Sequence, residues 1–190
     1  MKLLGTKATS TTLVVLGLGA TLAGTAQAQG IGSVLPVRVK VGVLLPSQGD
    51  TKSRTADTFF SGEVDVDLPA AGLGRRRVTV GYAQSVDGGQ TLRVIPVTLS
   101  QVFSPPNPAS GLTGNVYFGL GAGAYFTRAS GIPVAEGETD SESKTLLGGF
   151  AMAGYQFPNA FFVEGKYHLV SGKVAGLSPN GIAVLLGRRF

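Results

Sequence analysis

The chain has 190 residues, of which 29 are glycine, and only 14% are charged. The absence of cysteine excludes disulfide bonds, thiol catalysis and cysteine-based metal sites. The formal net charge is +5, and +3 remains once Lys2 and Lys7 of the leader are set aside. This small charge is spread over scattered basic residues, which argues against nucleic-acid binding.

The first 28 residues have the three parts of a secretory signal peptide. Lys2 and Lys7 supply the positive start, residues 13–20 form an apolar centre, and residues 26–28 read Ala-Gln-Ala. The apolar centre is too short and too rich in glycine to be a membrane helix. We expect residues 1–28 to be removed before Gln29, which leaves residues 29–190 as one exported domain.

Three segments in the first half alternate between apolar and polar residues with the period of a β-strand. Residues 37–43 set valines against Arg38 and Lys40. Residues 60–68 set Val64 and Val66 against acidic residues, and residues 75–84 set Val78, Val80 and Tyr82 against arginines and Thr79. Residues 46–54 and 69–74 lie between these strands as a polar loop and a Gly/Pro turn.

Residues 91–102 form a fourth predicted strand that contains Pro96. Proline cannot donate a hydrogen bond to a neighbouring strand, so we expect a bulge or a short unpaired stretch there. Leu92 and Val94 share one face, whereas Val97 and Leu99 share the other, and this change of parity favours a bulge. Residues 116–126 form a fifth strand, whose glycines at 119, 121 and 123 share a face with two tyrosines.

The second half contains the longest polar stretch, residues 127–144, which we expect to be a loop. Strands are predicted at 146–157, 161–170 and 182–190, with a Gly/Pro/Ser loop at 171–181. The count of strands is therefore eight. About 20 residues are available for each strand and its connection, which leaves room for membrane-spanning strands of ~10 residues.

The last predicted strand has Ile182, Val184, Leu186 and Phe190 on one face. This strand and the aromatic–Gly-x-Gly-x-Gly–aromatic pattern of residues 117–125 resemble small bacterial outer-membrane β-barrels of the OmpA/OmpX/OmpW-like kind. The resemblance implies an all-β fold, an eight-stranded antiparallel up-and-down transmembrane β-barrel. It also implies contact with outer-membrane lipid and lipopolysaccharide, and recognition of Phe190 as an assembly signal by the barrel-assembly machinery.

The charged residues at alternate positions are expected to face the lumen of such a barrel. Adjacent antiparallel strands bring such residues within reach of one another, and an eight-stranded barrel is just wide enough to be filled by side chains. We expect a lumen charge network formed by Arg38, Lys40, Glu63, Asp65, Asp67, Arg75, Arg77, Glu164 and Lys166.

The sequence offers no convincing catalytic or metal site. His168 is the only histidine, and Ser171, three positions away, would point to the opposite face of a regular strand. The acidic residues 136–142 lack the spacing of an EF-hand, although a divalent cation remains an alternative. We expect no catalysis, no cofactor and no bound metal.

The leading hypothesis is a monomeric outer-membrane barrel with a structural or surface-interaction role. One alternative is a narrow pore or binder for small or amphipathic solutes. Another is a soluble periplasmic barrel of lipocalin type, which requires Glu63, Asp65 and Arg77 outside and Val64 and Val80 inside.

Overall fold

The computed structural model describes residues 36–68, 74–85, 90–105, 114–135 and 138–190. The expected signal peptide lies outside these residues. The elements are β1 (Val37–Pro46), α2 (Gly49–Arg54), β2 (Phe59–Leu68), β3 (Arg75–Ser85), β4 (Thr91–Phe103), β5 (Asn115–Ala135), β6 (Glu138–Gln156), β7 (Phe161–Val170) and β8 (Gly181–Arg189). No helix among the described residues has the length and apolar character needed to cross a membrane.

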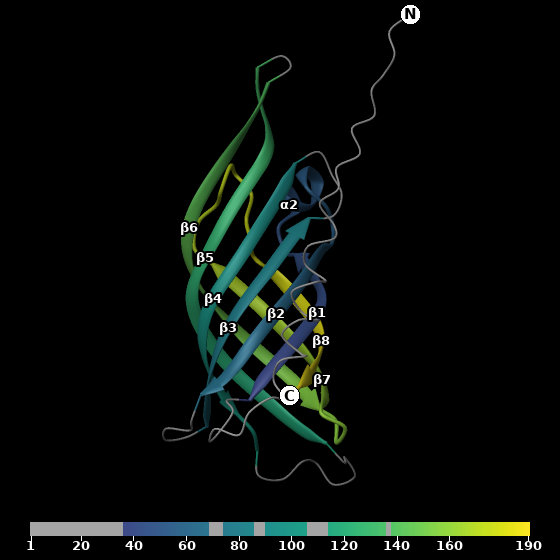
Figure 1. Cartoon of the computed structure of the whole chain (residues 1–190). Coiled ribbons are helices and arrows are strands. Elements are labelled where there is room, and N and C mark those ends of the chain that lie inside the picture. The colour runs from purple at the N-terminus through teal and green to yellow at the C-terminus, as the bar shows by residue number, and fades with distance from the viewer. Residues whose placement is uncertain (1–35, 69–73, 86–89, 106–113, 136–137) are drawn as a thin grey trace, which may run out of the picture. The chain divides into compact units, whose positions relative to one another are not determined.

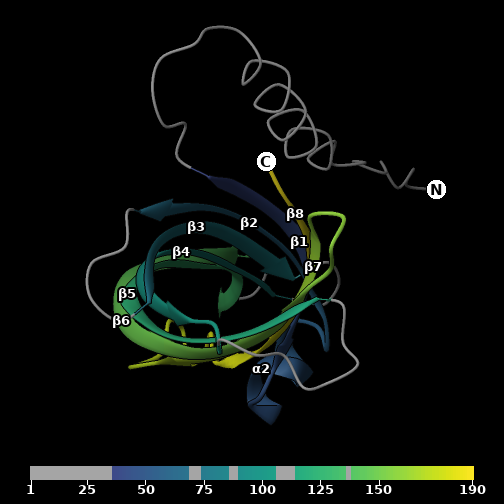
Figure 2. The same cartoon turned by 90° about the horizontal axis from the view of Figure 1, so that it is seen from below.

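The eight strands form a closed antiparallel barrel in which each strand pairs with its neighbours in the chain. The pairing of β1 with β8 closes the ring, as the view along the barrel shows (Figure 2). Helix α2 and the β5–β6 hairpin mark what we call the upper end (Figure 1). Strands β2, β4 and β6 finish at the lower end, where β3, β5 and β7 begin. The predicted all-β, eight-stranded antiparallel barrel is therefore confirmed.

Alternation along each strand separates an inner face from an outer face. On β2 the odd-numbered residues from 59 to 67 are buried, whereas the even-numbered ones are partly or fully exposed. On β7 and β8 the same alternation is strict, with Phe162, Ala183 and Leu185 buried and Leu169, Val184 and Leu186 exposed. The predicted division into faces is correct on these strands, because successive side chains of a strand point to opposite sides.

The predicted loop at residues 127–144 is wrong. Strand β5 continues to Ala135 and β6 begins at Glu138, and the two remain paired through this stretch with register shifts near Ser130 and Pro133. The resulting hairpin rises above the rest of the barrel (Figure 1). Polar residues signalled a loop in the sequence, but a strand pair above the apolar wall carries polar residues equally well.

The strand around Pro96 is paired without a bulge. The ladder between β4 and β5 is continuous from Thr91↔Ser130 to Phe103↔Phe118. On the other side, the paired residues of β3 and β4 stop at Val80↔Val97 and resume in the same register at Ala83↔Val94. The expected short unpaired stretch is therefore present, but the expected change of parity is wrong, since Leu92 and Val94 simply face inward.

Helix α2 lies in the stretch that we predicted to be a loop between β1 and β2. Its Thr51 is buried and exchanges hydrogen bonds with the backbone of Ser178: Thr51 Oγ1 donates to Ser178 O at 3.3 Å, and Ser178 N donates to Thr51 Oγ1 at 2.9 Å. These bonds join α2 to the β7–β8 connection. We call α2 together with residues 171–180 the upper cap.

Candidate functional site: the interior of the barrel

Lys40 of β1 is the centre of a group of buried charges in the lower half of the barrel. Its Nζ atom lies 2.6 Å from Glu63 Oε2, 3.0 Å from Asp65 Oδ2 and 2.8 Å from Glu164 Oε1. Lys166 of β7 shares two of these partners, with its Nζ 2.5 Å from Glu63 Oε2 and 3.6 Å from Glu164 Oε1. Lys40 thus connects carboxylates on β2 with one on β7, across the intervening strand β8.

Arg77 of β3 extends the group toward the lower end. Its Nε donates to Asp67 Oδ1 at 2.7 Å, and its Nη1 lies 3.3 Å from Glu164 Oε2 and 3.5 Å from Asp65 Oδ2. Arg38 of β1 has its Nε 3.3 Å from Asp67 Oδ2. Side chains from four strands are therefore joined into one set of ion pairs.

The structure brings together eight of the nine residues expected in the lumen charge network. All eight are at most 4% exposed, and their four cations equal their four carboxylates: Arg38, Lys40, Arg77, Lys166, Glu63, Asp65, Asp67 and Glu164. We call these eight residues the charge cluster. Arg75 is different, because its side chain is 37% exposed at the lower end and only approaches Asp67, at 4.0 Å.

Neutral residues that the sequence analysis did not assign to the network complete it. Thr79 Oγ1 donates to Asp65 Oδ1 at 2.7 Å, and Tyr117 OH donates to Glu164 Oε2 at 2.9 Å. The guanidinium of Arg38 stacks over Phe162 and Tyr117, at 5.0 and 5.6 Å from the ring centroids. Tyr117 and Thr79 could have been predicted from their inward positions, because buried carboxylates require hydrogen-bond donors as well as counter-charges.

The opposite wall makes room for large side chains by means of glycine. A Cβ atom at Gly121 would stand 2.5 Å from the ring of Phe150, and Cβ atoms at Gly119 and Gly154 would overlap Met152 and Tyr117. Since β5 and β6 carry these glycines, the aromatic and Met side chains can reach across the interior. The glycine positions of β5 and β6 therefore leave space for the side chains that fill the interior.

The upper half of the interior is filled by hydrocarbon. Its buried residues are Leu44, Phe59, Ala83, Leu92, Val94, Tyr125, Ala129, Val170, Val174, Leu177, Ala183 and Leu185. Two of them, Val174 and Leu177, belong to the upper cap and are fully buried. We call this set the apolar plug. These inward apolar side chains are a difference from the prediction, which placed polar residues along the interior.

Hydrogen bonds within the upper cap and to strand β6 hold the cap in place. Val174 and Leu177 exchange backbone hydrogen bonds of 3.0 and 2.8 Å around a tight turn. Glu142, on the extended part of β6, accepts a bond from the backbone N–H of Ala175 at 2.6 Å and pairs with Lys144 at 2.5 Å. The bond from Lys144 and the Ala175 N–H hold the pKa of Glu142 below its ordinary value.

His168 lies between the charge cluster and the apolar plug. Its Nδ1 is 2.9 Å from Tyr125 OH, and its ring packs against Tyr125 and Phe150 with centroids 5.8 and 5.6 Å apart. It is buried on the inward face, as the sequence predicted.

The expected acidic segment includes Glu136, which is outside the described residues. Among the described residues, no group of three or more potential ligands could hold a metal ion.

Comparison with known proteins supports the fold. No family model matches the chain, and no curated protein matches it in sequence. The structure is similar to the N-terminal β-barrel domain of Pseudomonas aeruginosa OprF, with a TM-score of 0.53 and 13% sequence identity, over 82% of this chain and 97% of that domain. At this identity the similarity shows a shared eight-stranded barrel fold.

Proposed function

We propose that the protein is an integral outer-membrane β-barrel with a structural or surface-interaction role and a filled, non-conducting interior. The observation that supports this most strongly is the inverted distribution of side chains: the charge cluster is buried, whereas large apolar residues are exposed. Asp65 is fully buried, whereas Val80, which follows the paired residue Thr79 on β3 and points to the other face, is 49% exposed. This is the reverse of the arrangement that a soluble lipocalin-like barrel requires.

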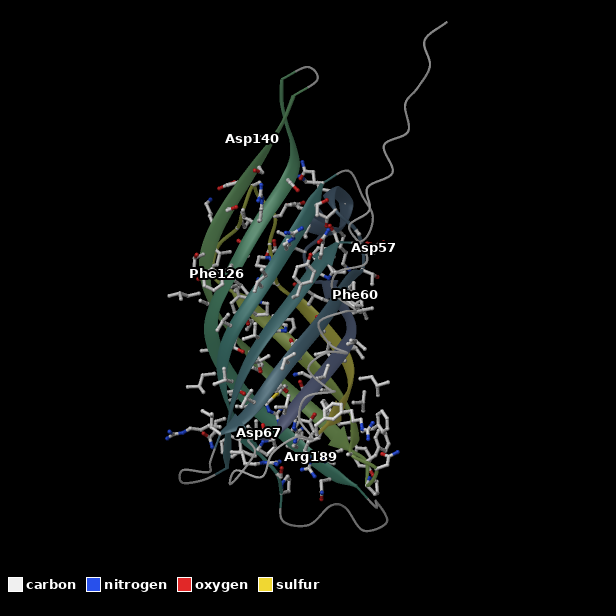
Figure 3. The ribbon with its side chains drawn as sticks, viewed as in Figure 1. Asp57, Phe60, Asp67, Phe126, Asp140 and Arg189 are labelled. Atoms are coloured by element: carbon white, nitrogen blue, oxygen red, sulfur yellow. The ribbon has the colours of Figure 1, made fainter. Side chains whose placement is uncertain are left out.

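The height of the outward apolar band suits a membrane. On β5 the outward residues from Val116 to Phe126 are all apolar, and they span ten residue steps. At about 3.3 Å per residue and a strand tilt of about 40°, this run is about 25 Å tall, the usual height of the lipid-facing band. In Figure 3, Phe60 and Phe126 lie at similar heights on the barrel, with Asp140 above them on the hairpin and Asp67 near the lower end.

An outward arginine distinguishes a membrane barrel from a soluble one. Leu120 is 64% exposed in the middle of the band. Leu120→Arg is expected to cost about 2–4 kcal/mol in a bilayer but almost nothing on a water-exposed surface. The measurement is urea unfolding after refolding into lipid vesicles, with Asn159→Arg in the exposed lower turn as control. Equal stability of both variants, together with recovery of the wild type in the soluble periplasmic extract, would exclude the proposal.

The closed interior supports a barrel that does not conduct. The charge cluster occupies the lower half and the apolar plug occupies the upper half, and this packing supports an interior without an open channel. We expect no steady single-channel current in planar bilayers. A reproducible conductance would favour the narrow-pore alternative.

We also propose that the barrel has no catalytic role, since His168 is engaged with Tyr125 and lies between aromatic rings.

We further propose that the outward face of β8 is recognised during assembly. Ile182, Val184 and Leu186 are about half exposed there, and Phe190 beyond them is 53% exposed. Arg188 lies over the rings of Phe161 and Phe190, at 5.7 and 5.2 Å. Phe190→Ser is expected to lower the membrane yield in cells while refolding in detergent stays near normal. A normal yield in cells would remove the recognition role.

A further inference from the structure

Two arginines stand directly opposite each other on the outer wall. Arg93 of β4 and Arg128 of β5 are paired residues, and the Cβ atoms of such pairs lie about 4.5–5.5 Å apart. Both side chains point outward, since Leu92 and Val94 on one strand and Thr127 and Ala129 on the other are buried. Like charges in this position repel each other, so the pair favours an anion between or above the two guanidinium groups.

Neither arginine is neutralised within the described residues. Arg93 lies over the ring of Tyr82 at 5.7 Å, and Arg128 Nη2 donates to Ser141 Oγ at 3.3 Å, but no ion pair joins either of them to a carboxylate whose side chain the structure describes. The two carboxylates of β6 whose side chains are described have other partners. Glu142 pairs with Lys144, and Asp140 accepts a bond from the backbone of Ser141. Arg93 and Arg128 therefore present two positive charges to whatever lies outside the wall.

A shallow groove of about 300 Å³ runs over this place. It is lined at one edge by Arg93, Arg128, Ser143 and Lys144, and at the other by Ile95 and Phe126. Phe126 is 47% exposed. The groove thus joins a cationic part, with the two arginines, to an apolar part. A ligand that fits both has an anionic head and a hydrocarbon chain.

The height of the groove identifies the source of such a ligand. Arg93 and Arg128 each lie one outward position above the last apolar residues of the band, Ile95 and Phe126. If the band spans the bilayer, as proposed above, the guanidinium groups reach the headgroup layer on the side of the β5–β6 hairpin. Guanidinium groups bind phosphate through paired hydrogen bonds, which a carboxylate-poor surface leaves available.

We propose that the Arg93–Arg128 groove binds the phosphate group of an outer-leaflet lipid, whose acyl chain lies over Ile95 and Phe126. The inference rests on the proposed membrane location. It assigns a lipid site to one wall, β4 to β6, rather than to the whole circumference.

The test uses the full chain purified in detergent and two probes, bisphosphorylated lipid A and the same lipid A without phosphates. Binding is followed by native mass spectrometry for the wild type, for Arg93→Gln/Arg128→Gln, and for the control Arg76→Gln/Arg189→Gln. The control removes the same charge from two exposed arginines at the lower end. We expect the first variant to bind phosphorylated lipid A about tenfold more weakly or worse, and the control to stay within about twofold.

The outcomes separate this inference from the proposed function. The wild type should bind lipid A without phosphates as weakly as the Arg93→Gln/Arg128→Gln variant binds the phosphorylated form. If that variant binds like the wild type, or if the control loses as much affinity, the groove is not a phosphate site. Heat-dependent gel migration and membrane recovery of each variant are measured in parallel. Failure of membrane recovery in the wild type contradicts the proposed function, whereas normal recovery with unchanged lipid binding contradicts only the groove.

Discussion

The two halves of the barrel interior are filled in opposite ways. In the lower half the charge cluster places four cations against four carboxylates, whereas in the upper half the apolar plug packs aliphatic and aromatic side chains under the upper cap. A charged filling depends on every partner, because removing one leaves the others buried without compensation. An apolar filling depends on volume, and its losses are graded by the cavity left behind. The same wall thus encloses two kinds of core with different sensitivities.

The largest effect is expected from Lys40→Met in the charge cluster. It removes the cation that lies within 3.0 Å of Glu63, Asp65 and Glu164. Deleting one partner of a buried ion pair costs about 3–5 kcal/mol. Urea unfolding in lipid vesicles measures the loss, with the exposed Lys173→Met as control. A Lys40→Met barrel as stable as the wild type would show that water replaces the lysine and that the interior is not tightly filled.

The corresponding change in the apolar plug is Leu92→Ala. Leu92 is fully buried beneath the upper cap, and truncation of a buried leucine costs about 2–5 kcal/mol. The same unfolding experiment should show a smaller loss than Lys40→Met. It should also show restoration by Leu92→Met, which conserves volume. A larger loss than for Lys40→Met would reverse the comparison between the two fillings.

A smaller effect is expected where a glycine makes room for a neighbour. A methyl group at Gly121 would meet the Phe150 ring at 2.5 Å, and overpacking of this kind costs about 1–3 kcal/mol. Gly165 on the outer face is the matched control, because its Cβ atom would meet only Ala153 O, at 3.9 Å. Thermal unfolding should separate Gly121→Ala from Gly165→Ala. Equal midpoints would mean that Phe150 moves freely and that the wall does not limit the filling.

The smallest effect concerns two turns, one at each end. Ala175 in the upper cap has φ 50° and Ala160 in the lower turn has φ 67°, a left-handed conformation that costs an L-residue about 1–2 kcal/mol. Ala175→Gly and Ala160→Gly should each stabilise the barrel by up to about 1 kcal/mol, because part of the gain is lost to chain entropy. Thermal midpoints should rise slightly for both. Ala175 packs against the plug and would lose this contact, so its midpoint should rise less than that of Ala160→Gly. A fall for both variants would contradict the assigned strain.

Much of the wall could be read from the sequence, because alternation with a period of two is a local signal. The inward positions of Arg38, Lys40 and Glu164 follow from their neighbours in the chain. The charge cluster was accessible for the same reason, since counting in twos places the charges on one face. Phe60 and Leu120 could likewise be assigned to the outer face.

The contents of the upper half could not be read in this way. Leu92 and Val94 are apolar and inward, so their face reads as an outer one when the interior is assumed to be polar. Helix α2 has only six residues and is joined to the barrel by Thr51 and Ser178, which are 127 positions apart in the chain. The long β5–β6 hairpin is fixed by pairing between its two strands, and its polar residues alone do not distinguish a strand from a loop.

The balance of charges inside the lower half also bears on how the ring closes. A slip of two residues between β1 and β8 would leave every side chain on its own face, so the outward apolar pattern cannot detect it. Such a slip would move Lys40 by about 7 Å relative to β7. Its Nζ, now 2.8 Å from Glu164, would be left beyond the reach of an ion pair. A barrel closed in the wrong β1–β8 register therefore buries unmatched charges. The charge cluster thus selects one register among several that lipid contact alone would accept.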